Sequence, residues 1–389
     1  MPPIKLPPLP IIWIGLATAF SLLGDQALYA LLPLYFEELG LIPFQVGIIL
    51  SANRWIRLVT NQLAENSTSR FSPKALSLCA LFVGSLLTAY YAFSHSFTLL
   101  LLARLMWGLC FSFIRHAGTM TVVSMKDGHL LGQKIGYYEG FSRMGSITGL
   151  LFGAILFDWI GFSSTFLIFA VLSLLAVPLG MMSPIPKTPW KQSHRWAAPG
   201  EKAIHLWGML FCGFTIGIVG QGLLISTLGF VLESRYGSSA TLFGFVLGIS
   251  TINGIMLASR WVMQSIGAPF LGALVDHIGL RKSASFFFLS GALALAWLSY
   301  VTELTSLFPG ILIFFACGTT LQIALISGIG KQGPKNYAKF VTASDIGSAA
   351  GPVLGWTLLE FIGNPNIAFI AGICFYAIAA LVSPFTFKK

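Results

Sequence analysis

The sequence has few charged residues. Only 9% of its 389 residues are Asp, Glu, Lys or Arg, whereas soluble domains carry roughly 25%. Hydrophobic residues make up 56% of the chain, and the mean hydropathy is +0.81. A soluble protein of this length could not bury so much apolar surface. The composition therefore predicts a membrane protein whose solvent is the lipid bilayer.

The motifs of several enzyme and cofactor classes are also absent. The sequence has no GxxxxGK[ST] loop, no nucleophile elbow and no dinucleotide fingerprint. Its five cysteines fall inside apolar runs without CxxC spacing, which argues against a disulfide framework or a metal site. We therefore expect no enzyme activity, no cofactor and no metal. The formal charge of +10 is compatible with nucleic acid binding, but the positions of the charges fit a membrane topology better, so we expect no nucleic-acid partner.

Long polar segments are scarce, and twelve apolar runs are each long enough to cross a bilayer. The runs cover approximately residues 11–35, 42–65, 75–94, 98–123, 132–157, 162–183, 205–232, 240–268, 283–302, 306–328, 338–361 and 365–386. The one long polar segment, residues 184–204, divides them into two sets of six. We predict an all-α membrane protein of twelve transmembrane helices, with six-helix bundles at 1–183 and 205–389 joined by a cytoplasmic loop.

The basic residues of the loops give the orientation. Lys and Arg are enriched in cytoplasmic loops, and all but Arg235 fall on one side of the predicted topology. These residues are Lys5, Arg70, Lys74, Lys126, Lys134, Lys187, Lys191, Arg195, Lys202, Arg281, Lys282, Lys331, Lys335, Lys339, Lys388 and Lys389. Both termini are therefore expected in the cytoplasm, and the membrane is expected to be a bacterial inner membrane.

The two halves of the sequence are similar to each other. GSITGLLFGAILFDWIG (145–161) aligns with GSAAGPVLGWTLLEFIG (347–363). In two further helix pairs, Asp25 aligns with Gln221, and Arg54 aligns with Arg260 within a shared Arg-Trp-aliphatic motif. A six-helix unit duplicated in parallel is typical of transporters that bind substrate between their halves.

The chain resembles the major facilitator superfamily. Its GALVDHIGLRK stretch, from Gly272 to Lys282, fits the family's loop signature Gly-x-x-x-Asp-x-x-Gly-x-Arg-Lys. The ARLMWG stretch from Ala103 to Gly108 fits a helix 4 pattern, and helix 11 carries a Gly-x-x-x-Gly-Pro-x-x-Gly run. The first-half loop has Ser69 where the second has Asp276, and Leu150 stands where helix 11 has Pro352. The resemblance implies alternating access and a gate at the loop signature.

Charged residues inside the predicted helices are the candidate functional residues. Helices 3, 6, 9 and 12 contain none, which indicates that these four face lipid and that the others line a shared interior. A charge in the bilayer costs at least about 2.5 kcal/mol, so it is expected to face a cavity or a partner. The interior charges are Arg54, Arg57, Arg104, Arg115, Arg143 and Arg260 against Asp25, Glu139 and Asp345. This surplus of positive charge favours an anionic substrate, because the guanidinium fork fits carboxylate and phosphate oxygens.

We assign three sets of candidate residues. For substrate binding we expect Arg54, Arg260, Arg57, Arg104 and Arg143. For proton coupling we expect Asp25, Asp345 and Glu139, and for gating Asp276, Arg281, Gly272 and Arg115. A structural role remains open for several of them. Arg54 and Arg260 could pair with Asp25 or with helix carbonyl groups, and Glu139 with Arg143, four residues apart, favours an ion pair within one helix.

These observations predict a secondary active transporter. We expect a monomer that moves a small anionic metabolite or chelate, bearing a carboxylate or phosphate, by alternating access and with proton coupling. One alternative is a proton-coupled efflux antiporter for lipophilic drugs, with Asp25 as the proton site. Another is a membrane receptor without transport activity.

Overall fold

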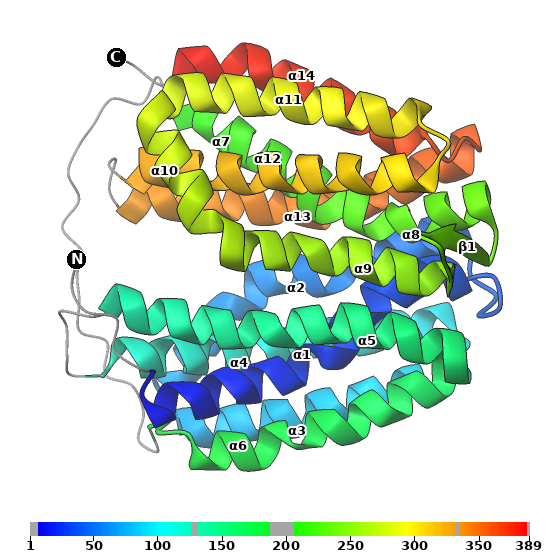
Figure 1. Ribbon diagram of the computed structural model, residues 1–389. Helices are drawn as coiled ribbons and strands as arrows, with labels where there is room; N and C mark the ends of the chain where they lie inside the picture. The colour runs from blue at the N-terminus through cyan, green and yellow to red at the C-terminus, as the bar shows by residue number, and fades with distance from the viewer. Residues whose placement is uncertain (1–6, 126–130, 187–205, 331–333, 387–389) are drawn as a thin grey trace. The chain divides into compact units, whose positions relative to one another are not determined.

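The computed structural model describes residues 7–125, 131–186, 206–330 and 334–386, which are mostly helical (Figure 1). Most of the predicted central loop, residues 187–204, lies outside the described residues. So do several of the basic residues that carry the predicted orientation, namely Lys5, Lys126, Lys187, Lys191, Arg195, Lys202, Lys331, Lys388 and Lys389.

The first half of the sequence folds into six spans. Its helices are α1 (Leu9–Tyr35), α2 (Pro43–Thr68), α3 (Pro73–Tyr91), α4 (Phe97–Val123), α5 (Leu131–Leu174) and α6 (Ala176–Met182). The long α5 contains the fifth span and most of the sixth, and Gly161 separates them with a φ of 78°. A side chain is strained at this φ, so a glycine allows the chain to turn here without a longer loop.

The second half also folds into six spans, two of which contain a π-helical turn. Its helical elements are α7 (Leu206–Thr215), η3 (Ile216–Leu223), α8 (Leu224–Tyr236), α9 (Ile249–Val262), η4 (Met263–Gly267), α10 (Ala268–Ile278), α11 (Leu280–Tyr300), α12 (Leu304–Gly330), α13 (Pro334–Ile362) and α14 (Ile367–Thr386). The run from α7 to α8 forms one span, and the run from α9 to α10 forms another. Among the described residues, this architecture agrees with the prediction of an all-α protein with twelve transmembrane helices, and eight of the helices are long and apolar enough by themselves to cross a membrane.

The predicted start of the eighth helix is wrong. We expected a helix from residue 240, but β1 (Ser239–Leu242) and β2 (Phe245–Gly248) pair there as an antiparallel hairpin, and α9 begins at Ile249. The two turn residues, Phe243 and Gly244, have φ values of 51° and 85°. Two consecutive positive φ values match the twist of a two-residue hairpin and cannot continue a helix. Apolar content alone does not distinguish a hairpin from a membrane helix here, because Phe245 and Val246 suit a strand as well as a membrane helix.

The chain divides into two compact units. Unit 1 contains Met1–Leu28 and Ile56–Ser193, and unit 2 contains Tyr29–Trp55 and His194–Lys389. The end of α1 and the start of α2 thus belong to the same unit as the second half of the sequence. Within unit 2, Asn253 donates to the Ala30 carbonyl at 3.0 Å, and the Phe44 amide donates to Glu360 at 2.7 Å. The predicted division at residues 184–204 remains a prediction about the two bundles.

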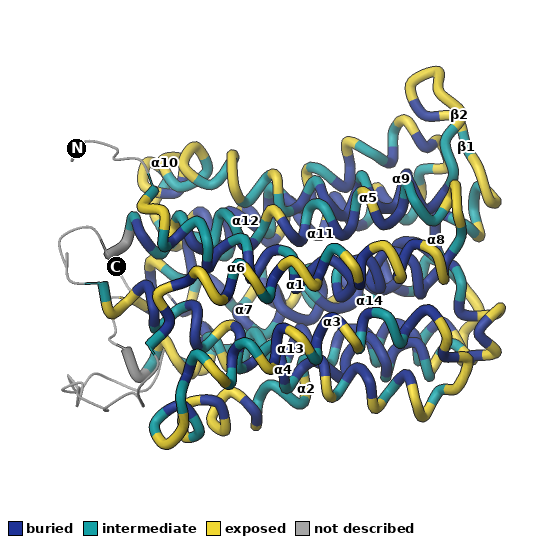
Figure 2. Tube along the Cα trace, turned by 90° about the horizontal axis from the view of Figure 1, so that it is seen from below, coloured by how far each residue is buried: buried dark blue, intermediate teal, exposed yellow. Residues whose placement is uncertain are grey.

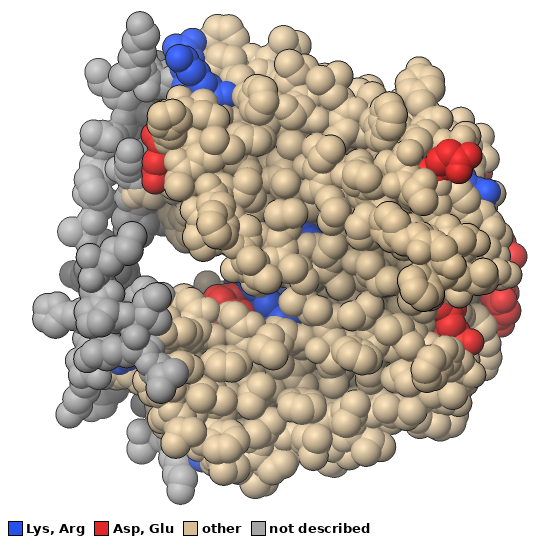
Figure 3. Space-filling model, in the orientation of Figure 1, with Lys and Arg blue, Asp and Glu red and all other residues tan. Residues whose placement is uncertain are grey.

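The predicted helices 3, 6, 9 and 12, which lack internal charges, contain exposed apolar residues, and Figure 2 colours exposed positions yellow. These residues are Phe82 and Leu86 on α3, Leu167, Ile168 and Val171 on the part of α5 after Gly161, Leu289 and Leu293 on α11, and Leu381 and Phe385 on α14. Charged residues are sparse on the face drawn in Figure 3. Exposed apolar surface of this kind suits contact with lipid tails.

The duplicated glycine run brings two pairs of helices into close contact. A β-carbon on Gly145 of α5 would lie 2.1 Å from the Ala19 carbonyl oxygen of α1. In unit 2, a β-carbon on Gly347 of α13 would lie 2.3 Å from the Phe214 carbonyl oxygen of α7. Small residues allow helix backbones to approach closely in membranes, where packing replaces the hydrophobic effect. The repeat seen in the sequence is therefore a repeat of backbone contacts.

This packing predicts opposite outcomes for two glycines of α5. Gly145→Ala should destabilise the protein by about 1–3 kcal/mol, because the new methyl group has to displace the α1 backbone. Gly140→Ala is the matched control, since nothing lies within 4 Å of its β-carbon position. The control should be neutral or stabilising by up to about 1 kcal/mol through helix propensity. Thermal unfolding in detergent measures both, and equal midpoints for the two variants would contradict the close contact.

Candidate functional site

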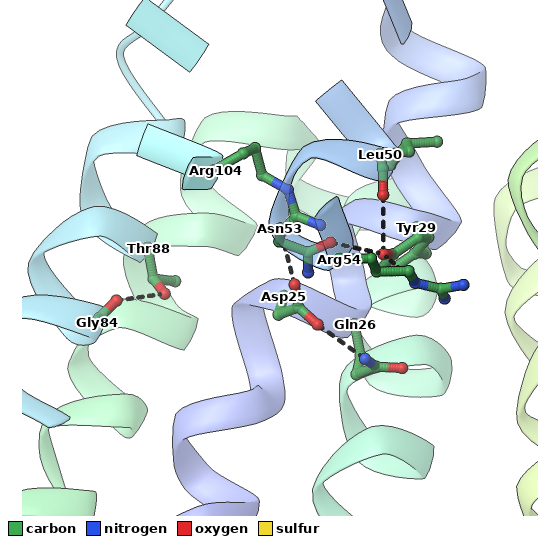
Figure 4. A network of polar contacts seen from close by, with 9 residues as sticks. All are labelled: Asp25, Gln26, Tyr29, Leu50, Asn53, Arg54, Gly84, Thr88 and Arg104. Carbon is green, nitrogen blue, oxygen red and sulfur yellow. Dashed lines mark hydrogen bonds and ion pairs between the residues drawn. The ribbon is translucent and has the colours of Figure 1, made fainter. Parts of the chain in front are cut away.

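A buried ion pair joins α1 and α4 inside unit 1 (Figure 4). Nη1 of Arg104 donates to Oδ1 of Asp25 at 2.6 Å, and the two residues are 0% and 3% exposed. Nε2 of Gln26 donates to the second carboxylate oxygen at 2.9 Å. Two opposite charges that far from water are stable only when they compensate each other, and removal of one partner is costly. We considered Arg54 as the partner of Asp25. That prediction is corrected in part, because Arg104 forms the ion pair.

Arg54 is held in unit 2 by backbone carbonyl groups. Its Nη1 donates to the carbonyls of Gln221 at 2.6 Å and Ser348 at 2.8 Å, and its Nε donates to the Tyr29 hydroxyl at 3.1 Å. The Tyr29 hydroxyl donates in turn to the Leu50 carbonyl at 2.9 Å (Figure 4). The guanidinium also lies 5.1 Å from the centre of the Tyr29 ring. Of the structural roles left open for Arg54, bonding to helix carbonyls is the one observed.

A proline explains why a carbonyl group on α13 is available to Arg54. In an α-helix the carbonyl of residue 348 accepts from the amide of residue 352, but residue 352 is Pro352, which has no amide hydrogen. The Arg54 guanidinium supplies the donor that the proline lacks. The Gly-x-x-x-Gly-Pro run of the sequence therefore contained a signal for this contact. The first half has Leu150 at the aligned position and so keeps its amide.

Arg260 lines a cavity in unit 2. The cavity lies between η3, the end of α9, η4, α12 and α14. Its lining residues are Ile216, Gly220, Gln221, Arg260, Gln264, Phe314, Phe315, Gly318, Thr319, Gln322 and Tyr376. Arg260 is 7% exposed and lies 5.0 Å from the centre of the Trp261 ring. Neither Arg54 nor an acidic residue is among the described residues that line it.

Amide side chains share this cavity with Arg260. Gln264 lies in η4, four residues after Arg260, and its Nε2 donates to Oε1 of Gln322 on α12 at 3.3 Å. Gln221 comes from η3. We predicted only charged residues for the site, so Gln264 and Gln322 were missed, and Gln221 was noted only as the residue aligned with Asp25. They carried a usable signal, because polar residues are rare in membrane-spanning segments and usually face a cavity or a pathway.

The other predicted site residues lie elsewhere. Glu139 and Arg143 form the expected ion pair within α5, at 4.0 Å, with both side chains partly exposed. Arg57 lies 5.4 Å from the centre of the Phe111 ring in unit 1. Arg115 is exposed on α4, and Asp345 is half-buried on α13.

Three of the four predicted gate residues lie on either side of a tight turn. Asp276 is exposed in the last turn of α10, Arg281 is exposed at the start of α11, and Gly272 is half-buried on α10. Gly279 separates the two helices with a φ of 88°. The second glycine of the loop signature is thus required by the backbone conformation. Within the described ranges, no group of three or more His, Cys, Asp or Glu residues is placed to hold a metal ion.

Parts of the chain are similar to known transporters. The synaptic vesicular amine transporter of Rattus norvegicus is 30% identical over 353 residues, which are 87% of this chain and 65% of that protein. The chromaffin granule amine transporter of Homo sapiens is 30% identical over 148 residues, or 37% of this chain and 28% of that protein. The chain thus spans less than two thirds of these relatives. The quinolone resistance protein NorA of Staphylococcus aureus is 21% identical over 127 residues, 33% of each chain.

Solved structures share the fold. A bacterial homologue of the human lysosomal transporter Spinster, in an inward-facing and unoccupied conformation, superposes with a TM-score of 0.77 at 14% identity, covering 98% of each chain. The nucleoside transporter NupG has a TM-score of 0.77 at 13% identity, covering 98% of this chain and 99% of that one. At these identities the likeness concerns the fold alone.

A family model decides the classification. The model of the Major Facilitator Superfamily matches residues 14–263, which is more than half of the chain. The match begins in α1 and ends at the boundary of α9 and η4, so it includes helices from both halves of the sequence. The protein belongs to the Major Facilitator Superfamily.

Proposed function

We propose that this transporter moves a small anion, with a carboxylate or phosphate group, and binds it at Arg260. The observation that carries the proposal is the cavity in unit 2, where a nearly buried arginine and three glutamines meet without an acidic lining residue among those described. A guanidinium in a site of low dielectric attracts an anion strongly and can bind two of its oxygens at once. The glutamine amides orient the ligand, and Phe314 and Phe315 suit an apolar body.

The buried ion pair in unit 1 supports an anion over a cation. Asp25 is the most buried acid of the predicted interior, and Arg104 already compensates its charge at 2.6 Å. An amine substrate at Asp25 would have to displace Arg104 and leave that guanidinium without its counter-charge, at a cost of about 3–5 kcal/mol.

A second candidate follows from the named relatives. Two of them are called amine transporters and one a quinolone resistance protein, which favours a lipophilic cation as cargo and export as the direction. The aromatic residues of the cavity suit such a cargo, but Arg260 would repel its charge. We therefore rank this candidate second. A receptor without transport activity would bind ligand and show no flux.

We propose that Asp25 couples transport to protons by exchanging Arg104 for a proton. A protonated carboxyl loses its attraction for the guanidinium, so proton binding would release Arg104 and deprotonation would restore the pair. Asp345 and Glu139 are weaker candidates, since neither is buried as deeply. Roles of Arg57, Arg104 and Arg143 in substrate binding also remain proposals.

We propose that Arg54 acts as a latch rather than as a substrate ligand. Its bonds connect α2 of the first half of the sequence to η3 and α13 of the second half, within unit 2. A cycle of alternating access would break and re-form these bonds. Asp276, Arg281 and Gly272 are proposed to form the gate that the family's loop signature implies. A gating role for Arg115 also remains a proposal.

We further propose that the protein is a monomer in a bacterial inner membrane, with both termini in the cytoplasm. The distribution of Lys and Arg supports the orientation of the termini, because nearly all basic loop residues fall on one side of the predicted topology.

The substrate class is tested by paired ligands. Acids and amines of the same carbon skeleton are compared by thermal shift, followed by flux in proteoliposomes for those that bind. We expect the acids to stabilise the wild type and Arg260→Ala to abolish the shift. Arg260→Lys should recover little of it, because an ammonium lacks the planar fork. Arg70→Ala, at an exposed loop position, is the control and should bind normally. Stabilisation by the amines alone would favour the second candidate.

The ion pair predicts a non-additive pair of substitutions. Asp25→Asn strands a buried guanidinium and should destabilise the protein by about 3–5 kcal/mol. Adding Arg104→Gln removes both charges, so the double variant should unfold at a higher temperature than Asp25→Asn alone. Under the coupling proposal, the double variant exchanges substrate at matched pH, but a pH gradient does not increase its substrate uptake. Unimpaired uptake driven by a pH gradient would eliminate Asp25 as the proton carrier.

The latch predicts rescue by removal of a proline. Arg54→Gln should cost about 1–3 kcal/mol, because the Ser348 carbonyl loses its donor, while an acid that binds at Arg260 should still bind. Adding Pro352→Ala returns a backbone amide to that carbonyl and should recover part of the stability. Thermal unfolding of the wild type, the Arg54→Gln and Pro352→Ala single variants and the double variant measures the coupling between the two positions. Additive changes in stability would show that Arg54 and Pro352 act independently.

A further inference from the structure

Tyr376 places a buried hydroxyl group at the cavity without using it within the protein. The residue is 0% exposed, and its hydroxyl has no hydrogen-bond partner among the described residues. A buried hydroxyl left unsatisfied is rare because it has lost its hydrogen bonds with water and gained none in return. Tyr376 is one of the residues that line the cavity beside Arg260. The natural partner for its hydroxyl is therefore a molecule inside that cavity.

The surrounding helices leave room for such a partner. β-Carbons built on Gly220 of η3 and Gly318 of α12 would each lie 3.9 Å from the hydroxyl oxygen. Both glycines line the cavity, so two elements present no side chain where the hydroxyl lies. At these two positions no side chain covers the hydroxyl.

The ring is fixed in place. Phe288 and Phe314 each pack against it with ring centres 5.4 Å apart. On α11, a β-carbon on Gly291 would lie 2.6 Å from Cε1 of Tyr376, so only a glycine admits the ring at that point. The hydroxyl consequently cannot swing away to find another partner. It is a preorganised group, which avoids the entropic cost of ordering a side chain on binding.

The position of Tyr376 was unexpected from the sequence. It lies on α14, which has no charged residue between Ile367 and Thr386 and which we predicted to face lipid. Exposed residues such as Leu381 are consistent with that prediction for one face of the helix. Tyr376 lies on the opposite, buried face and contributes a polar group to the cavity from α14.

We infer that Tyr376 determines specificity by hydrogen bonding to a second polar group of the substrate, separate from the anionic group at Arg260. The inference rests on the proposed function, since it takes the same cavity as the binding site. It defines the substrate class further as acids that carry a hydroxyl or carbonyl group away from the carboxylate or phosphate. The tyrosine hydroxyl can donate or accept, so it serves either group.

The lining residues define suitable probes. Arg260 fits a carboxylate, and Phe314 and Phe315 fit a flat apolar ring. Hydroxybenzoates carry a carboxylate, a flat apolar ring and one hydroxyl. They are suitable probes, as are hydroxylated and unsubstituted phenylacetates and cinnamates.

The test measures the affinity of each hydroxylated acid and its unsubstituted partner for the wild type and for Tyr376→Phe. In the wild type we expect at least one hydroxylated acid to bind about tenfold more tightly than its partner, the effect of one net hydrogen bond. In Tyr376→Phe this preference should vanish, with the affinity of the unsubstituted acid unchanged. The thermal midpoint of the unliganded variant should equal or exceed that of the wild type, because an unsatisfied buried hydroxyl has been removed.

A control variant tests whether the effect is specific to Tyr376. Tyr91→Phe alters another fully buried tyrosine, which lies in unit 1 and does not line the cavity, and should leave the preference unchanged. A purely structural role for Tyr376 would instead lower the midpoint of Tyr376→Phe and leave the preference intact. If the acids bind at Arg260 without any hydroxyl preference, the Tyr376 assignment is overturned and the proposed function stands. If no acid binds to the wild type, both fall.

Discussion

The cost of a charge in the membrane interior determines how this protein is organised. A charged side chain cannot remain in lipid, so each one needs a counter-charge, a set of hydrogen-bond acceptors or a polar cavity. All three solutions occur here. Arg104 is compensated by Asp25, Arg54 by carbonyl groups of two other helices, and Arg260 by the polar lining and aromatic neighbour of a cavity.

These three solutions correspond to three functional requirements of a transporter. The Asp25–Arg104 pair can respond to a proton, because protonation removes the attraction between its members. The Arg54 bonds depend on a carbonyl that Pro352 leaves without an amide, so they can break without disrupting a helix. Arg260 adjoins empty space and is therefore the arginine best placed to meet a ligand. Under the roles proposed above, the surplus of arginine in the sequence separates into coupling, conformational control and binding.

Close helix contacts provide the rigid background for these groups. Gly145 on α5 and Gly347 on α13 each let a neighbouring helix approach to backbone contact, and both belong to the duplicated motif. Since lipid is as apolar as a side chain, such contacts supply the packing energy that a soluble protein gains from excluding water. The repeat therefore preserves the scaffold, while the polar residues differ between the halves, as Asp25 and Gln221 do.

Most of the fold followed from the sequence, but the site followed only in part. Apolar runs of sufficient length indicate membrane helices directly, and Gly161 and Gly279 mark turns because of their backbone freedom. The hairpin at 239–248 was missed because apolar β-branched and aromatic residues fit both structures. The charges were found, but the partner of Asp25 was not, since pairing across helices depends on their rotation and depth. Gln264, Gln322 and Tyr376 were missed because a search for charges ignores neutral polar groups.

The most direct test of the account is the position of a bound anion. A structure with 4-bromobenzoate, in which the anomalous signal of bromine marks the ligand, locates both ends of the molecule. The account predicts the carboxylate against the Arg260 guanidinium and the bromine-bearing ring among Phe314, Phe315 and Tyr376. A ligand bound at Asp25 and Arg104, or anywhere outside the unit 2 cavity, would contradict the claim that Arg260 binds the substrate.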